Sequence, residues 1–217
     1  MWEVNAAVPC VNTRAFFSKT GRAKYISAID LNNCVLRAVR RSGLPVWQTE
    51  GFNPHTYVAF VLPLSLGQEG EREAMDFRLL EDIPYDEVAE RLNSALPPDI
   101  RVSEVKAPVF KNSDIGSAEY RIESDIDRDK FAAFAARDEI LTEKKTKKGI
   151  TTLDLKPLIY KLDFSDGSFS VRLPAGNELN INPALLLDAY WKQEEQSPSK
   201  VRIVRTKIFC VSGEEFR

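Results

Sequence analysis

An amphipathic helix with marked ends, placed between two strand-like segments, constrains the fold most strongly. Ser27 is a typical helix N-cap, and Asp30 stands three residues later, as in a capping box. The helix runs to about Ser42, because Gly43 follows it and Pro45 prevents its continuation. One face carries the apolar residues Ala28, Leu31, Val35, Ala38 and Val39 at helical spacing. This face predicts a helix that packs on a sheet.

The segments around this helix predict the order strand, helix, strand, strand, helix, strand. The expected strands are at residues 8–18, 56–64, 71–80 and 100–107, and Pro84 begins a second helix that runs to about Leu96. The two middle strands are predicted to form a hairpin. This is the order of the ferredoxin-like motif, in which both helices cover one face of an antiparallel sheet.

The second half of the chain follows the same order after a linker at residues 108–116. Its predicted elements are strands at 119–124, 158–164, 168–173 and 201–211, helices at 127–137 and 182–192, and an extra hairpin at 139–155 that turns at 147–149. The halves share no residue-level repeat, so the duplication rests on element order alone. We therefore expect an α+β protein of two ferredoxin-like (βαββαβ) units in tandem, the second decorated with an extra strand pair. The expected domains are 1–108 and 117–217.

The composition predicts a soluble globular protein, with a hydrophobic share of 43% and a charged share of 29%. No stretch approaches ~18 consecutive apolar residues, so no membrane span is expected. The first residues lack the basic and apolar regions of a signal peptide, which predicts a cytoplasmic protein. The cysteines are far apart and His55 is the single histidine, so neither a metal site nor a cofactor is expected.

Charge is unevenly distributed along the chain, although the net charge is only −2. Residues 1–55 are rich in Arg and Lys, whereas residues 68–99 are rich in Asp and Glu. We expect a binding site where the turn at residues 19–24 meets the loop at residues 51–55. Its candidate residues are Lys19, Arg22, Lys24, Tyr25, Arg37, Arg41, Phe52, Asn53 and His55. The basic side chains suit phosphates and the aromatic rings suit unpaired bases, but solvated or mutually paired charges are the alternative.

Several long motifs of this chain resemble a bacterial family. They are the run from Phe17 to Leu31, the run from Arg37 to Pro45, Gly51-Phe-Asn-Pro-His, Leu62-Pro-Leu-Ser-Leu-Gly, Glu73-Ala-Met-Asp-Phe, Thr152-Leu-Asp-Leu-Lys-Pro-Leu-Ile and Val204-Arg-Thr-Lys-Ile. Together these motifs are similar to the radical SAM-linked proteins, a family of unknown function (DUF2344). The resemblance extends over most of the chain.

The resemblance implies an accessory role. Family members are fused to radical S-adenosylmethionine (SAM) enzymes or are encoded beside them, and this chain lacks the closely spaced three-cysteine motif of those enzymes. The family usually has a histidine where this chain has Ala28, and a proline where it has Thr56. If that histidine is functional, this chain is an inactive or divergent member. If the histidine only packs against the sheet, alanine is harmless.

Three functions are consistent with these residues. The first is a non-catalytic accessory protein of a radical SAM enzyme, which binds or presents RNA through the basic N-terminal site. The second is a protein-docking subunit without nucleic-acid binding, in which Phe52 is an interface anchor. The third is a metal-free hydrolase or nuclease in which His55 is the general acid or base, oriented by Asp30 or Asp76. The single histidine and the lack of an activated nucleophile favour a protein that is not an enzyme.

Overall fold

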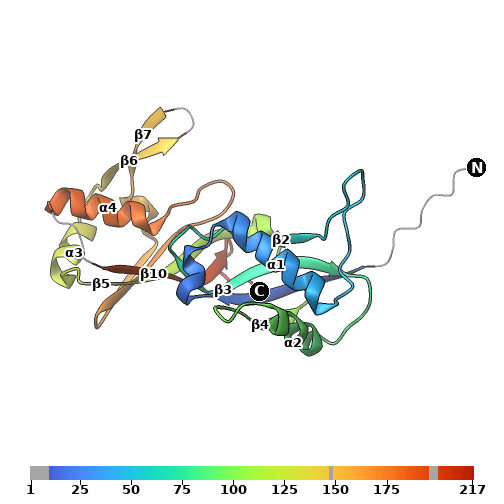
Figure 1. The fold of residues 1–217 in the computed structure, drawn as a ribbon. Coiled ribbons are helices and arrows are strands. Elements are labelled where there is room, and N and C mark those ends of the chain that lie inside the picture. The colour runs from blue at the N-terminus through green and yellow to red at the C-terminus, as the bar shows by residue number, and fades with distance from the viewer. Residues whose placement is uncertain (1–9, 147–148, 196–199) are drawn as a thin grey trace, which may run out of the picture. The chain divides into compact units, whose positions relative to one another are not determined.

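The computed structural model describes residues 10–146, 149–195 and 200–217 (Figure 1). The protein is α+β, as the sequence predicts, and the chain divides into two compact units. The first unit contains the described residues up to Val109 together with Arg217, and the second contains Phe110 to Phe216. Within the described ranges, no helix is both long enough and apolar enough to cross a membrane.

The first unit combines an antiparallel sheet with two α-helices. Its elements are β1 (Val11–Lys19), the 3-10 helix η1 (Gly21–Tyr25), α1 (Ala28–Ser42), β2 (Val58–Phe60), β3 (Glu69–Leu79), α2 (Tyr85–Ala95) and β4 (Ile100–Lys106). The strands are hydrogen-bonded in the order β4-β1-β3-β2. The central strand β1 is therefore paired along both of its edges, which satisfies its backbone groups inside the unit.

The strand β2 is shorter than the sequence predicts, because it covers only residues 58–60 of the expected 56–64. The Val61 N–H still donates to the Ala74 carbonyl at 3.0 Å, which continues the contact with β3 by one residue. Pro63 then has no N–H to donate, so it cannot extend the ladder. The chain leaves the sheet here, and residues 62–64 line a cavity together with the first turns of α1.

The helix α1 has the ends that its sequence predicts. Ser27 Oγ accepts a hydrogen bond from the Asp30 N–H at 3.1 Å, and Gly43 ends the helix with a φ of 69°. The buried residues of the helix are Leu31, Val35, Ala38 and Val39, all of them in the core of the unit. Ala28 was expected on the same face but is exposed, because it is the first residue of the helix and lies beside a cavity rather than over the core.

The described residues of the second unit form a sheet, two α-helices and a separate hairpin. Its elements are η2 (Asn112–Asp114), β5 (Ile115–Ser124), α3 (Arg128–Ala135), β6 (Leu141–Thr146), β7 (Gly149–Asp154), η3 (Lys156–Leu158), β8 (Lys161–Ser165), β9 (Ser168–Pro174), α4 (Pro183–Glu194) and β10 (Val201–Cys210). Antiparallel pairing gives the strand order β10-β5-β9-β8, and β6 pairs with β7 in a two-stranded sheet of its own. Residues 147–148 of the predicted hairpin turn lie outside the described residues.

A cluster of aromatic rings forms the core of the second unit. Phe131 of α3 lies 4.4 Å from Phe169 of β9 and 5.0 Å from Tyr190 of α4, measured between ring centroids. Phe134 of α3 also contacts Tyr190 at 5.3 Å. Phe131 therefore packs α3 against β9, and Tyr190 packs α4 against α3 in the same cluster.

Candidate functional site

The two loops that were expected to form one binding surface lie near opposite ends of the first unit's sheet (Figure 1). The turn at residues 19–24 follows the end of β1 where Lys19 pairs with Gly70 of β3. The loop at residues 51–55 belongs to a hairpin that joins β3 near Leu79. Strand β3 rises ~3.3 Å per residue, so roughly 30 Å separates these two positions. The shared surface is therefore not formed.

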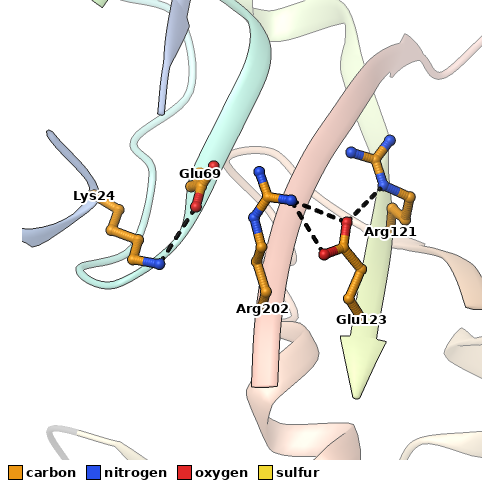
Figure 2. A network of polar contacts seen from close by, with 5 residues as sticks. All are labelled: Lys24, Glu69, Arg121, Glu123 and Arg202. Carbon is orange, nitrogen blue, oxygen red and sulfur yellow. Dashed lines mark hydrogen bonds and ion pairs between the residues drawn. The ribbon is translucent and has the colours of Figure 1, made fainter. Parts of the chain in front are cut away.

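The bases of the first loop are mostly engaged within the protein. Lys19 was expected on the accessible turn, but it is only 1% exposed and its Nζ donates to the Ile26 carbonyl at 3.3 Å. Lys24 is paired with the buried Glu69, with Nζ and Oε1 3.4 Å apart (Figure 2). Arg22 remains accessible, since its side chain is 92% exposed beside Asp99. The turn therefore presents Arg22 to solvent rather than a cluster of three bases.

Some basic residues of α1 are free to face solvent, whereas one is engaged in a contact within the protein. Arg37 and Arg40 are exposed on the outer face of the helix. Arg41 is also exposed, but its Nη2 donates to the Ala95 carbonyl at 2.6 Å. Ala95 ends α2, where carbonyl groups lack partners within the helix, so Arg41 stabilises the contact between the two helices.

The contacts of His55 are those of a residue that orders its own loop. Its Nδ1 lies 2.8 Å from Thr49 Oγ1 and 3.3 Å from the Asn53 carbonyl. The carboxylates proposed to orient it lie elsewhere, because Asp30 accepts from Ser27 and Asp76 pairs with Arg14. Within the described residues, no three His, Cys, Asp or Glu side chains are grouped as metal ligands. The aromatic residue of this loop, Phe52, is fully exposed.

The structure instead brings several other segments together around a cavity of about 330 Å³, which we call the α1 pocket. Its walls come from the end of β1, the first turns of α1, the segment after β2 and the middle of β3. The lining residues are Phe17, Lys19, Ala28, Ile29, Leu31, Asn32, Phe60, Leu62, Pro63, Leu64 and Glu73. Most of these side chains are apolar, so the pocket suits an apolar group.

Two buried charged residues, Lys19 and Glu73, add polar atoms to the lining of the α1 pocket. They are 1% and 3% exposed, and each has partners inside the protein. Gly70 makes room for the carboxylate, because a Cβ atom at this position would lie 2.3 Å from Glu73 Oε1. The pocket therefore combines apolar walls with fixed charges, which is typical of sites that orient a ligand.

Exposed apolar side chains lie on the segments that line the α1 pocket or adjoin them in the chain. Ile29, which lines it, is 74% exposed, and Tyr25 and Leu66 are 69% and 66% exposed. The Gly67 N–H donates to the Lys24 carbonyl at 2.8 Å, which holds the segment of Leu66 beside that of Tyr25. Exposed apolar groups gathered at one place on a protein surface often mark an interaction site.

A protein-family model matches the part of the chain that contains the α1 pocket. A protein-family model described as an uncharacterized protein conserved in bacteria (DUF2344) matches residues 12–183, which is most of the chain. The chain belongs to the DUF2344 family. No curated protein matches the chain. All residues that line the α1 pocket of this DUF2344 protein lie within the matched residues 12–183.

Sequence reasoning found part of the α1 pocket in this DUF2344 protein and missed the rest. Lys19 was among the candidate binding residues, and Ala28 was noted as a departure from the family pattern. The residues that were missed include Ile29, Leu62, Leu64 and Glu73. They lie in the family-like motifs that were assigned to strands and a helix. The sequence contained these motifs but did not show that they meet around one cavity. Only the folded structure shows this.

Proposed function

We propose that this chain is a non-catalytic accessory protein that docks on a partner protein through the α1 pocket. The observation that carries the proposal is an apolar pocket lined by the exposed Ile29, with exposed Tyr25 and Leu66 on the segments that adjoin it in the chain. The partner class expected from the family resemblance is a radical SAM enzyme, which would supply the chemistry in its own active site. Binding of this kind needs no catalytic group in the present chain.

The occupant that fits the α1 pocket is an aromatic side chain of the partner, tryptophan or tyrosine. Such residues are favoured anchors of protein interfaces, where one side chain fills a pocket and loses its contact with water. A volume of about 330 Å³ accommodates one large side chain with its neighbouring backbone. An indole N–H or a phenol O–H needs a polar partner when it is buried, and Glu73 places a carboxylate in the pocket lining.

RNA binding is the second candidate function, and a narrower surface supports it. Arg37 and Arg40 are exposed on the outer face of α1, and Arg22 is exposed on η1. These guanidinium groups suit phosphate contacts. Docking is favoured over RNA binding because Lys19 is buried and the aromatic Phe52 lies at the far end of the sheet from Arg22.

The test places a photo-cross-linking amino acid at position 29 in one variant and at position 52 in another, in cells that make the full chain. We expect position 29 to cross-link to one protein and position 52 to cross-link to none. The purified partner is then titrated with the unmodified chain, with Ile29→Asp and with Phe52→Asp. Ile29→Asp should weaken binding at least ~10-fold, because it places a charge in an apolar contact.

Phe52→Asp is the matched control, since it also changes a fully exposed apolar residue of the first unit. Loss of binding with Phe52→Asp but not with Ile29→Asp would overturn docking through the α1 pocket. A parallel titration with structured RNA at low salt tests the second candidate. RNA binding that falls with Arg37→Glu and Arg40→Glu, together with no protein cross-link at position 29, would replace docking by RNA recognition.

We also propose that both units are ferredoxin-like and that the second carries β6 and β7 as its extra strand pair. The strand order β4-β1-β3-β2 of the first unit supports this, and β10-β5-β9-β8 is the corresponding order in the second. In the second unit, the contacts of Phe131 with β9 and of Tyr190 with α3 agree with two helices on one face of the sheet. An experimental structure with parallel neighbouring strands in either unit would contradict the assignment.

A further inference from the structure

A second cavity, of about 880 Å³, opens at one end of the sheet of the second unit. The start of β5 and the end of β9 meet there, because Ser117 pairs with Pro174. The start of β8 and the end of β10 reach the same end through Lys161 and Cys210. All of the residues that line this cavity belong to the second unit. We call it the strand-end pocket.

Arg172 is held in a fixed orientation in the wall of the strand-end pocket. Its guanidinium carbon lies 3.5 Å from the centre of the Phe209 ring, which supports one flat side of the group. Its Nε donates to Ser117 Oγ at 2.9 Å, and Ser117 is only 4% exposed. Among the described residues, this is the one hydrogen bond of the Arg172 side chain. Both terminal amino groups are therefore available for a ligand.

Among the described residues, the neighbouring carboxylates leave Arg172 without an ion pair. Lys161 lies opposite Arg172 on β8, and it is paired with Asp163 at 2.6 Å between Nζ and Oδ2. This hydrogen bond is the main reason that the pKa of Lys161 is raised. Glu119 lies opposite Arg172 on β5 and accepts from Thr206. Glu178 also lines the pocket, so a ligand of high negative charge would be repelled.

Apolar side chains complete the strand-end pocket. Tyr160, Leu179 and Val211 line it and are 55%, 38% and 78% exposed. A ligand that lay over these groups would remove apolar surface from water, which is favourable. The fixed guanidinium and the apolar wall together suit a singly charged anion with an apolar body.

We infer that the strand-end pocket binds a small organic monocarboxylate with an aromatic or apolar body. The two terminal amino groups of Arg172 bind the carboxylate, in the paired geometry that guanidinium and carboxylate groups favour. Tyr160, Leu179 and Val211 contact the body of the ligand. This site is separate from the α1 pocket and does not depend on the function proposed there.

The test uses the full chain and two matched probes, N-acetylphenylalanine and its neutral amide. Binding is followed by NMR through the Nε–Hε signal of Arg172 and the backbone amides around the pocket. We expect N-acetylphenylalanine to shift the Arg172 signal, and the amide to bind at least ~10-fold more weakly because it lacks the charge. Arg172→Gln should reduce binding of the carboxylate to the level of the amide.

Two further variants guard against a general loss of structure. Tyr160→Ser changes an exposed ring and should weaken the carboxylate several-fold without altering the fold. Arg202→Gln removes an arginine that does not line the pocket and should leave binding unchanged. Equal binding of the carboxylate and the amide, or no shift of the Arg172 signal with either, would overturn the inference. Binding of inorganic phosphate that depends on Arg172, without binding of the carboxylate, would overturn the ligand class.

Discussion

The two units use their charged residues differently. In the first unit, Arg14 is 1% exposed and its guanidinium pairs with Asp76 through two contacts, of 2.7 and 2.9 Å. In the second unit, Glu123 accepts from both Arg202 and Arg121 in a network whose side chains are about a third or more exposed (Figure 2). The basic zone that looks like a surface in the sequence is thus partly interior in the first unit. Charge along a sequence does not by itself identify accessible charge.

The largest effect is expected when the Arg14–Asp76 pair of the first unit is broken. Arg14→Ala should lower the free energy of unfolding by about 3–5 kcal/mol, because it leaves the Asp76 carboxylate without its guanidinium partner. Urea unfolding followed by circular dichroism measures this change. The matched variant in the second unit is Arg202→Ala, which should cost at most about 1 kcal/mol because the pair is exposed to solvent. Equal losses in the two variants would contradict the contrast between the units.

A smaller loss of stability is expected when either of two glycines with positive φ is replaced by alanine. Gly176 of the second unit has a φ of 149°, and a Cβ atom there would lie 2.6 Å from the Ile115 carbonyl oxygen. Gly43 of the first unit has a φ of 69°, and a Cβ atom there would meet no atom within 4 Å. Gly176→Ala should therefore cost about 2–3 kcal/mol, and Gly43→Ala only about 1 kcal/mol. Thermal unfolding of the two variants tests this order.

The helix caps should contribute about equally in the two units. Ser27 accepts from the Asp30 N–H at the start of α1, and Asn182 accepts from the Ala184 N–H at the start of α4. Ser27→Ala and Asn182→Ala should each cost about 1 kcal/mol, because each leaves a helical N–H without its acceptor. Amide hydrogen exchange should show faster opening in the first turn of the affected helix. Unchanged exchange in either helix would show that its cap contributes nothing.

The smallest expected effect is a pH-dependent contribution to stability from one glutamate in each unit. Hydrogen bonds from Lys106 and Arg72 lower the pKa of Glu104 in the first unit. Burial alone would raise the pKa of Glu123 in the second, but its contacts with Arg202 and Arg121 outweigh this and the pKa is lowered. A carboxylate with a lowered folded-state pKa stabilises the protein above its unfolded pKa. That stability is lost as the pH falls through the folded-state value.

Glu104→Gln and Glu123→Gln should therefore each destabilise the protein by less than about 1 kcal/mol at pH 7, since both carboxylates are more than a third exposed. The difference from the unsubstituted chain should shrink as the pH falls from about 4.5, the ordinary pKa of the group, towards 3. Urea unfolding at pH 7 and at pH 3 measures it. If the difference in unfolding free energy were the same at both pH values, the ion pairs of these glutamates would not be its cause.

Local features of the fold were predictable from the sequence, but the site was not. The ends of α1 were correct because Ser27, Asp30 and Gly43 act within a few residues of their own positions. The length of β2 was overestimated because its apolar run continues past Pro63, where pairing has already stopped. Lys19 was expected at the surface because it stands beside a polar turn, yet the end of β1 places it in the interior.

The sequence by itself determined the order of strands and helices, the caps of α1 and the family to which the chain belongs. These depend on hydrogen bonds, apolar periodicity and motifs that a short segment contains. Only the tertiary structure decided that the turn at residues 19–24 and the loop at residues 51–55 are far apart, and that Ala28, Leu62 and Glu73 meet in one pocket. The reason is the register of β1 on β3, which fixes the distance between segments that their sequence positions leave open.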